Sequence, residues 1–154
     1  MVFAARSSQT EWGVWNVPLD GGVPIKLGTS VETTPAISPD GRQVAYEYLD
    51  PAVRRIKLCL QPLEGGPVTT IADSDVGFSN IRWTTDGKAI AYVSNSEGRT
   101  NIWTQPVAGG APSRLTNFNS EWLMRFDWSR DGKQLICVRG RLTSDLFMIS
   151  SVGK

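Results

Sequence analysis

The strongest constraint on the fold of this chain is an internal repeat with a period of 44 to 46 residues. A Pro-Leu-acidic-Gly-Gly pattern begins at Pro18 and Pro62, and a looser copy begins at Pro106, so 44 residues separate successive copies. A second pattern, a turn that ends in Asp-Gly, runs in phase with the first at intervals of 46 and 45 residues. Its aspartates are Asp40, Asp86 and Asp131. A fixed period of this length is typical of folds that stack one small unit on the next.

Each repeat is expected to hold four short β-strands, because no segment keeps a 3.6-residue apolar rhythm for the length of a helix. Asp-Gly and Gly-Gly mark tight reversals between the strands, since glycine adopts positive φ at little steric cost. The length of 154 residues is that of one domain. The fourteen expected strands cover residues 2–6, 14–19, 25–27, 35–38, 44–49, 56–63, 68–71, 81–84, 89–94, 102–107, 113–116, 126–129, 135–139 and 146–150.

The composition excludes several function classes. The sequence contains no histidine, which removes imidazole general bases, Ser-His-Asp and Cys-His arrangements and histidine metal ligands. A formal net charge of +1 provides no overall field that would draw the chain to nucleic acid or an anionic membrane. The two cysteines, Cys59 and Cys137, form no disulfide framework and have no metal-ligand spacing around them. We therefore expect no catalytic residues, cofactor, metal, nucleic-acid binding or membrane insertion.

Four antiparallel strands in each repeat, separated by glycine turns, are typical of a β-propeller blade. The chain resembles the TolB-type, WD-repeat-like propeller family, whose repeat carries a Trp-Ser-Pro-Asp-Gly turn before a short apolar strand. Residues 128–132 (Trp-Ser-Arg-Asp-Gly) and 38–41 (Ser-Pro-Asp-Gly) match this turn, whereas residues 83–87 (Trp-Thr-Thr-Asp-Gly) depart from it at the Ser-Pro pair. Segments 101–103 and 139–149 also resemble the last blades of bacterial sensor propellers.

The blade order of that family implies an all-β, partial β-propeller with about 3.5 four-stranded antiparallel blades. The strand that runs into Asp-Gly is innermost in this order, so the fourteen strands divide into three, two complete sets of four, and three. Because even a ring of four blades needs about sixteen strands, we expect an open arc. The repeat units are 1–41, 42–87, 88–132 and 133–154.

The resemblance implies a non-enzymatic module that binds a protein or peptide as a sensor or scaffold, in the C-terminal part of a propeller from a larger bacterial protein. It also implies a periplasmic or otherwise extracytoplasmic location, although two thiols are compatible with the cytoplasm as well. One alternative is the non-catalytic gating propeller of a prolyl-oligopeptidase-like serine peptidase. Another is a half-propeller that self-associates through its open terminal blades, whose apolar faces lack a neighbour.

Partner contacts are expected in the loops before the inner strands and between the second and third strands of each blade. These loops are longer and richer in polar and aromatic residues than the Asp-Gly and Gly-Gly turns at the other face. Trp122 and Arg99 are expected to contribute most, because aromatic and arginine side chains dominate protein interfaces. The alternative is that all are ordinary solvated loop residues. The candidates are Glu32, Arg54, Phe78, Arg99, Trp122 and Arg141.

Two further expectations concern contacts between blades. Arg82 and Asp127 each precede a tryptophan of an inner strand, so neighbouring blades should bring them together as a partly buried ion pair. Tryptophans that recur in register are expected in the core between blades, as is Cys59 in the slot of a tryptophan. These tryptophans are Trp15, Trp83, Trp103 and Trp128.

Overall fold

The computed structural model describes residues 2–6, 12–29, 35–74, 78–96 and 98–141. All regular structure in these residues is β-strand, so the predicted all-β class is confirmed. No helix in this part of the chain is long and apolar enough to cross a membrane. The strands are β1 (Val2–Arg6), β2 (Trp12–Asn16), β3 (Ile25–Thr29), β4 (Ala36–Ile37), β5 (Gln43–Asp50), β6 (Arg55–Pro62), β7 (Thr69–Ser74), β8 (Ser79–Trp83), β9 (Ala89–Ser96), β10 (Arg99–Pro106), β11 (Ser113–Arg114), β12 (Trp122–Trp128) and β13 (Leu135–Gly140).

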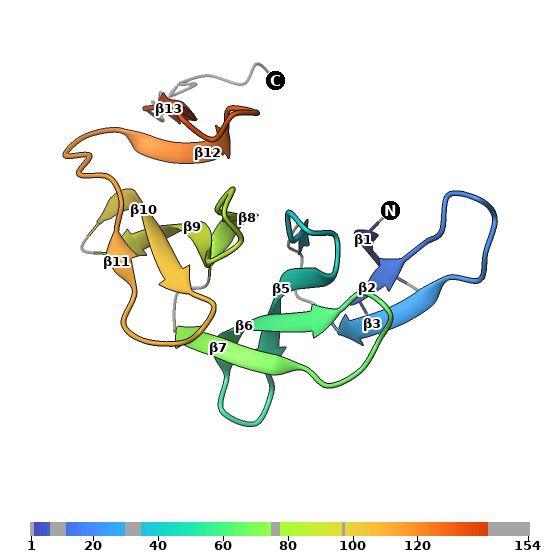
Figure 1. Ribbon diagram of the computed structural model, residues 1–154. Helices are drawn as coiled ribbons and strands as arrows, with labels where there is room; N and C mark the ends of the chain where they lie inside the picture. The colour runs from blue at the N-terminus through green and yellow to red at the C-terminus, as the bar shows by residue number, and fades with distance from the viewer. Residues whose placement is uncertain (1, 7–11, 30–34, 75–77, 97, 142–154) are drawn as a thin grey trace, which may run out of the picture.

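The strands form antiparallel sheets that follow one another along an open arc (Figure 1). Two sheets are complete four-stranded blades, with the orders β4-β5-β6-β7 and β8-β9-β10-β11. A three-stranded sheet, β1-β2-β3, precedes them, and a two-stranded sheet, β12-β13, follows them. The predicted partial propeller is therefore confirmed, with the strand before each Asp-Gly turn at the inner edge of its sheet. The expected strand at 146–150 lies outside the described residues.

Each Asp-Gly turn is held together by the side chain of its own aspartate. Ser38 Oγ donates a hydrogen bond to Asp40 Oδ1 at 2.6 Å, and the Arg42 amide donates to the same oxygen at 3.1 Å. Gly41 has a φ of 71°, which any larger residue adopts at a steric cost. The same bonds recur among Thr84, Asp86 and Lys88, and among Ser129, Asp131 and Lys133. These carboxylates are therefore turn residues, as the sequence predicts.

The turn carboxylates should make the stability of the fold depend on pH. Hydrogen bonds from the neighbouring hydroxyl, and then from the backbone, hold the pKa of Asp40, Asp86 and Asp131 below the ordinary value of 3.8. A lowered folded-state pKa stabilises the fold above the unfolded pKa, and this stabilisation is lost as the pH falls through the folded pKa. We expect the melting temperature to fall below pH 3.8, and to fall less in Ser38→Ala. The exposed Ser79→Ala serves as the control, and identical pH profiles in all three proteins would contradict the prediction.

The apolar core lies between successive blades rather than within one. Three clusters of buried side chains fill the three interfaces. The first joins Val14 and Leu27 to Val44, Tyr46 and Cys59. The second joins Ala36, Ala45, Leu58 and Leu60 to Phe78, Ile81, Trp83, Ile90 and Tyr92. The third joins Ala91, Val93 and Ile102 to Leu123 and Phe126. Each blade is thus stabilised by its neighbours, as expected for a repeat fold.

The recurring tryptophans contribute to these interfaces. Trp83 is 7% exposed, and its Nε1 donates a hydrogen bond to the carbonyl oxygen of Ala36 in the preceding blade, at 2.9 Å. Trp103 and Trp128 are partly buried against the second and third clusters. Trp15 is half-buried. The predicted role between blades is clearest for Trp83.

Candidate functional site

One face of the arc carries the loops that the sequence analysis singles out. Arg54 lies in the β5–β6 hairpin, Arg99 begins β10, and Arg141 follows β13. The pairing of Ile56 with Ser74 places the end of β7 beside the β5–β6 hairpin. The hairpins and the segments that lead into the inner strands therefore share one face, which we call the loop face. All three arginines are exposed on it.

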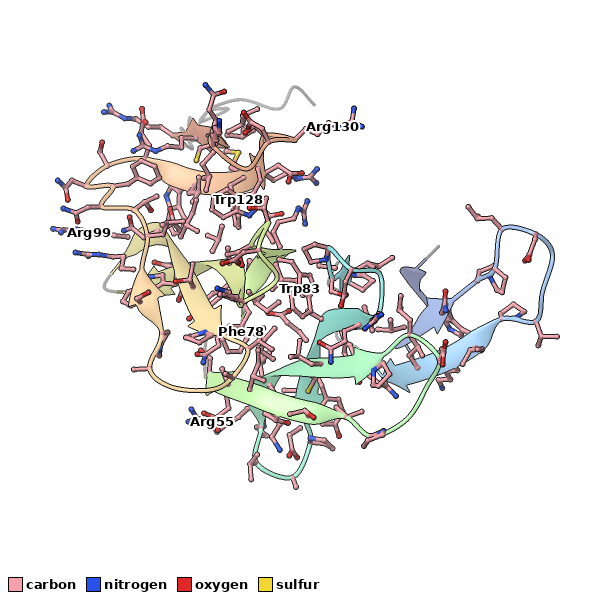
Figure 2. All side chains as sticks on the ribbon, in the orientation of Figure 1. Arg55, Phe78, Trp83, Arg99, Trp128 and Arg130 are labelled. Carbon is pink, nitrogen blue, oxygen red and sulfur yellow. The ribbon has the colours of Figure 1, made fainter. Side chains whose placement is uncertain are left out.

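Trp122 and Arg99 are neighbours on the loop face, although they belong to successive blades. The Leu123 amide, one residue after Trp122, donates a hydrogen bond to Thr100 Oγ1 at 2.6 Å, and Thr100 directly follows Arg99. Figure 2 shows Arg99 at the edge of the molecule where β10 begins. Trp122 is 45% exposed, and it pairs with Gly140, so Arg141 follows at the same end of the sheet. Trp122 and Arg99 therefore lie on adjacent segments of the loop face, and both residues are exposed.

The loop before Trp122 is anchored to the preceding blade through Asn101. This side chain is buried, and its Oδ1 accepts hydrogen bonds from the Phe118 amide at 2.7 Å and from Thr116 Oγ1 at 3.0 Å. Its amide nitrogen donates to the Phe118 carbonyl at 3.3 Å. One buried asparagine therefore anchors the first part of the loop, at Thr116 and Phe118.

Arg139 fixes the last residues of the same loop. Its guanidinium carbon lies 3.9 Å from the centroid of the Phe118 ring, and its Nη2 lies 3.5 Å from Glu121 Oε2. It also donates a hydrogen bond to the carbonyl of Ser120. Glu121 has a φ of 67°, a conformation that these contacts hold in place immediately before Trp122. These contacts fix the last residues of the loop against β13.

One of the predicted contact residues is buried in the structure. Phe78 is 3% exposed, and its ring packs edge-on against Tyr92 with centroids 4.9 Å apart. Its amide donates a hydrogen bond to the buried carboxylate of Glu47 in the neighbouring blade. Phe78 was expected to contact a partner, but it belongs to the core between blades and offers almost no surface. Glu32 lies outside the described residues.

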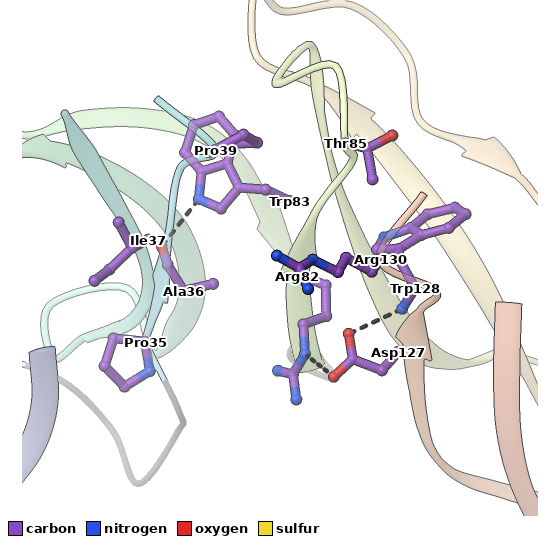
Figure 3. A pocket seen from close by; sticks show the side chains of 10 residues that line it. All are labelled: Pro35, Ala36, Ile37, Pro39, Arg82, Trp83, Thr85, Asp127, Trp128 and Arg130. Atoms are coloured by element: carbon purple, nitrogen blue, oxygen red, sulfur yellow. Dashed lines mark hydrogen bonds and ion pairs between the residues drawn. The ribbon is translucent and has the colours of Figure 1, made fainter. Parts of the chain in front are cut away.

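A groove between the inner strands is a second candidate site, which the repeat pattern does not predict. Its cavity volume is about 480 Å³, and it is lined by β4, β8, β12 and their Asp-Gly turns (Figure 3). We call it the inner groove. Its charged residues are Arg82, Asp127 and Arg130, and its tryptophans are Trp83 and Trp128. The only sequence signal for it is the shared register of Arg82 and Asp127.

The expected contact between Arg82 and Asp127 is present. Arg82 Nε lies 3.5 Å from Asp127 Oδ2, across the boundary between two blades. The Asp127 side chain is 65% exposed, however, so the pair is more exposed to water than the predicted partly buried pair. Water screens such pairs, which typically contribute about 0.2–1 kcal/mol.

A double-mutant cycle tests the energy of this pair. We expect Arg82→Ala and Asp127→Ala to show a coupling energy of about 0.2–1 kcal/mol in urea unfolding, smaller at high salt. The same cycle made with Lys88→Ala, an exposed cation outside the pair, is the control. Strictly additive effects of the two alanines at low salt would contradict the prediction.

The side chains of both sites offer hydrogen-bond donors and apolar area. Guanidinium groups remain protonated at neutral pH and donate hydrogen bonds, and indoles provide apolar area. Within the described ranges, no three His, Cys, Asp or Glu side chains are grouped so as to hold a metal. Burial raises the pKa of the Cys59 and Cys137 thiols, which disfavours the nucleophilic thiolate.

Comparison with solved structures identifies the fold as that of a TolB-type β-propeller. TolB from Acinetobacter baumannii superimposes with a TM-score of 0.77 at 22% identity, covering 94% of this chain and 36% of that one. The propeller domain of the trilobed protease from Pyrococcus furiosus, described as having an open velcro topology, gives 0.60 at 19% identity over 84% of this chain and 41% of that one. A chain of a nidogen–laminin complex gives 0.63 at 16% identity, over 83% and 49%.

The curated proteins with similar sequences are named as peptidases. Tricorn protease homolog 1 of Streptomyces coelicolor is 30% identical over 97 residues, which are 63% of this chain and 8% of that protein. Dipeptidyl-peptidase 5 of Porphyromonas endodontalis is 27% identical over 105 residues, 66% of this chain and 15% of that one. The uncharacterized peptidase YuxL of Bacillus subtilis is 27% identical over 123 residues, with coverages of 79% and 18%. The chain spans less than a fifth of these relatives, and no protein-family model matches it.

Proposed function

We propose that this chain is part of a non-enzymatic propeller that binds a protein partner through its loop face. The observation that carries the proposal is that Trp122 and Arg99 are both exposed on adjacent segments of the loop face, and that Asn101 and Arg139 hold the loop before Trp122. Tryptophan and arginine are enriched among the residues that contribute most to binding at protein interfaces. A rigid loop presents them with little loss of conformational entropy.

We further propose that this propeller acts as a sensor or scaffold outside the cytoplasm, as part of a longer bacterial polypeptide. The likeness of the fold to TolB supports this context, and the similarity to a chain of a nidogen–laminin complex supports a protein as the ligand. Arg54 and Arg141 are exposed on the same face and extend the proposed contact surface.

The test is the affinity of a partner that is isolated with the full-length protein. We expect Trp122→Ala and Arg99→Ala each to weaken binding by about 1–3 kcal/mol, or roughly 5- to 150-fold in Kd. Arg42→Ala, an exposed arginine in an Asp-Gly turn at the other face, serves as the control and should bind normally. Unchanged affinity in both loop-face variants, with the fold intact, rejects this face as the binding site.

A second candidate is the non-catalytic gating propeller of a serine peptidase. The similarity to three proteins named as peptidases favours it. In this case the full-length protein should cleave peptides in a reaction that a serine-directed inhibitor blocks, and the cleaving residues should lie outside this segment. Trp122→Ala would then alter the size range of the peptides cleaved rather than the affinity for a folded partner.

A further inference from the structure

The inner groove has the dimensions of a ligand site. Its volume of about 480 Å³ lies within the roughly 300–1,000 Å³ typical of pockets that hold small ligands. Residues from three successive blades line it, including one from each Asp-Gly turn, and neither Trp122 nor Arg99 is among them. A ligand there would therefore leave Trp122 and Arg99 free.

The charged side chains of the groove leave one cation without an anionic partner. Arg82 is engaged by Asp127 at 3.5 Å and also donates a hydrogen bond to the carbonyl of Ile81 at 2.9 Å. Asp127 in turn accepts a hydrogen bond from the Trp128 amide at 2.9 Å. Arg130 has no ion pair or hydrogen bond to any described residue of the chain. The three charges of the lining thus sum to one positive charge, carried by Arg130.

The turn that holds Arg130 does not require an arginine. The equivalent position is Pro39 in one blade and Thr85 in the next, and both of those turns keep the same aspartate hydrogen bonds. Figure 3 shows Arg130 extending from its turn into the groove, between Trp83 and Trp128. Its guanidinium is therefore available to a ligand without any loss of local structure.

The walls around Arg130 strengthen its attraction for an anion. The apolar rings of Trp83, Trp128 and Pro39 line the groove together with the exposed Arg130. A charge beside apolar walls is screened less than one in open solvent. Guanidinium groups bind carboxylates with two parallel hydrogen bonds, while proline and tryptophan surfaces suit the apolar parts of an extended peptide.

From these observations we infer that the inner groove binds the carboxylate of an acidic peptide segment, with Arg130 as the anchoring cation. The carboxylate is that of a glutamate or aspartate side chain or of a free C-terminus, which share this chemistry. The site goes beyond the proposed loop-face function and does not depend on it.

Calorimetry on the complete 154-residue chain tests the inference with four short alanine-proline peptides. One is neutral, one carries an internal glutamate, one has a free C-terminal carboxylate, and one has both. We expect the three acidic peptides to bind and the neutral one not to bind. The stronger of the two singly acidic peptides identifies the source of the carboxylate.

The matched variants are Arg130→Thr, which introduces the residue of the equivalent turn, and Arg42→Thr, at an exposed turn arginine outside the groove. We expect Arg130→Thr to weaken binding of the acidic peptides at least tenfold and to keep the wild-type melting temperature, with Arg42→Thr unchanged in both. Equal binding of the neutral peptide, unchanged affinity in Arg130→Thr, or no binding at all overturns the inference. Inorganic phosphate that competes at the affinity of the peptides also overturns it, because the groove would then be a general anion site.

Discussion

Replacing Trp83 by alanine is expected to lower the free energy of unfolding by about 3–5 kcal/mol, as measured by urea denaturation. The side chain is 7% exposed in the cluster between the two complete blades, so its removal leaves a cavity there. It also removes the hydrogen bond from Nε1 to the Ala36 carbonyl at 2.9 Å, which joins those blades. The variant therefore loses apolar packing and a buried polar contact together.

Two other substitutions serve as controls for this prediction. Trp122→Ala should change the free energy of unfolding by less than about 0.5 kcal/mol, because Trp122 is 45% exposed. Trp83→Phe should lie between the wild type and Trp83→Ala, since it keeps part of the apolar volume and loses the hydrogen bond. A loss of less than about 1 kcal/mol in Trp83→Ala would show that the blades do not depend on this contact.

The second large effect concerns the outward face of the last described sheet. Ile136 and Val138 lie on this face and are 62% and 52% exposed. In the two preceding blades, the equivalent positions are buried against the next blade. These four residues, each no more than 6% exposed, are Ala45, Glu47, Ala91 and Val93. Among the described residues, no blade covers this face of β13.

We expect this chain to self-associate, because the apolar face of a terminal blade gains a neighbour when two copies associate. The combined substitution Ile136→Lys and Val138→Lys should shift the population strongly toward the monomer, because burying two cations at an apolar interface is unfavourable. Size-exclusion chromatography with light scattering measures the mass directly. Val23→Lys, in a turn where Val23 is 84% exposed, is the control and should associate like the wild type. A monodisperse monomer of the unmodified chain would contradict the prediction.

The repeat in the sequence by itself determined the strands and their grouping into blades. Asp-Gly and Gly-Gly turns are local: Asp40 bonds within its own turn, and Gly41 adopts its positive φ, whatever the rest of the chain does. The period then sets the register, because equivalent residues recur at equivalent places in each sheet. This is why the contact of Arg82 with Asp127, 45 residues apart, could be predicted without a structure.

Only the tertiary structure decided which side chains are exposed and where the inner groove forms. The sequence predicts Phe78 in a loop because it precedes a strand. The neighbouring blade nevertheless covers its side chain, and Phe78 is only 3% exposed. Asp127 was expected to be partly buried, yet 65% of its side chain reaches water. The inner groove belongs to no single repeat, because it forms where the inner strands of three blades converge around Arg130. A repeat pattern specifies which residues are equivalent, but the packing of one blade against the next determines which of them are covered.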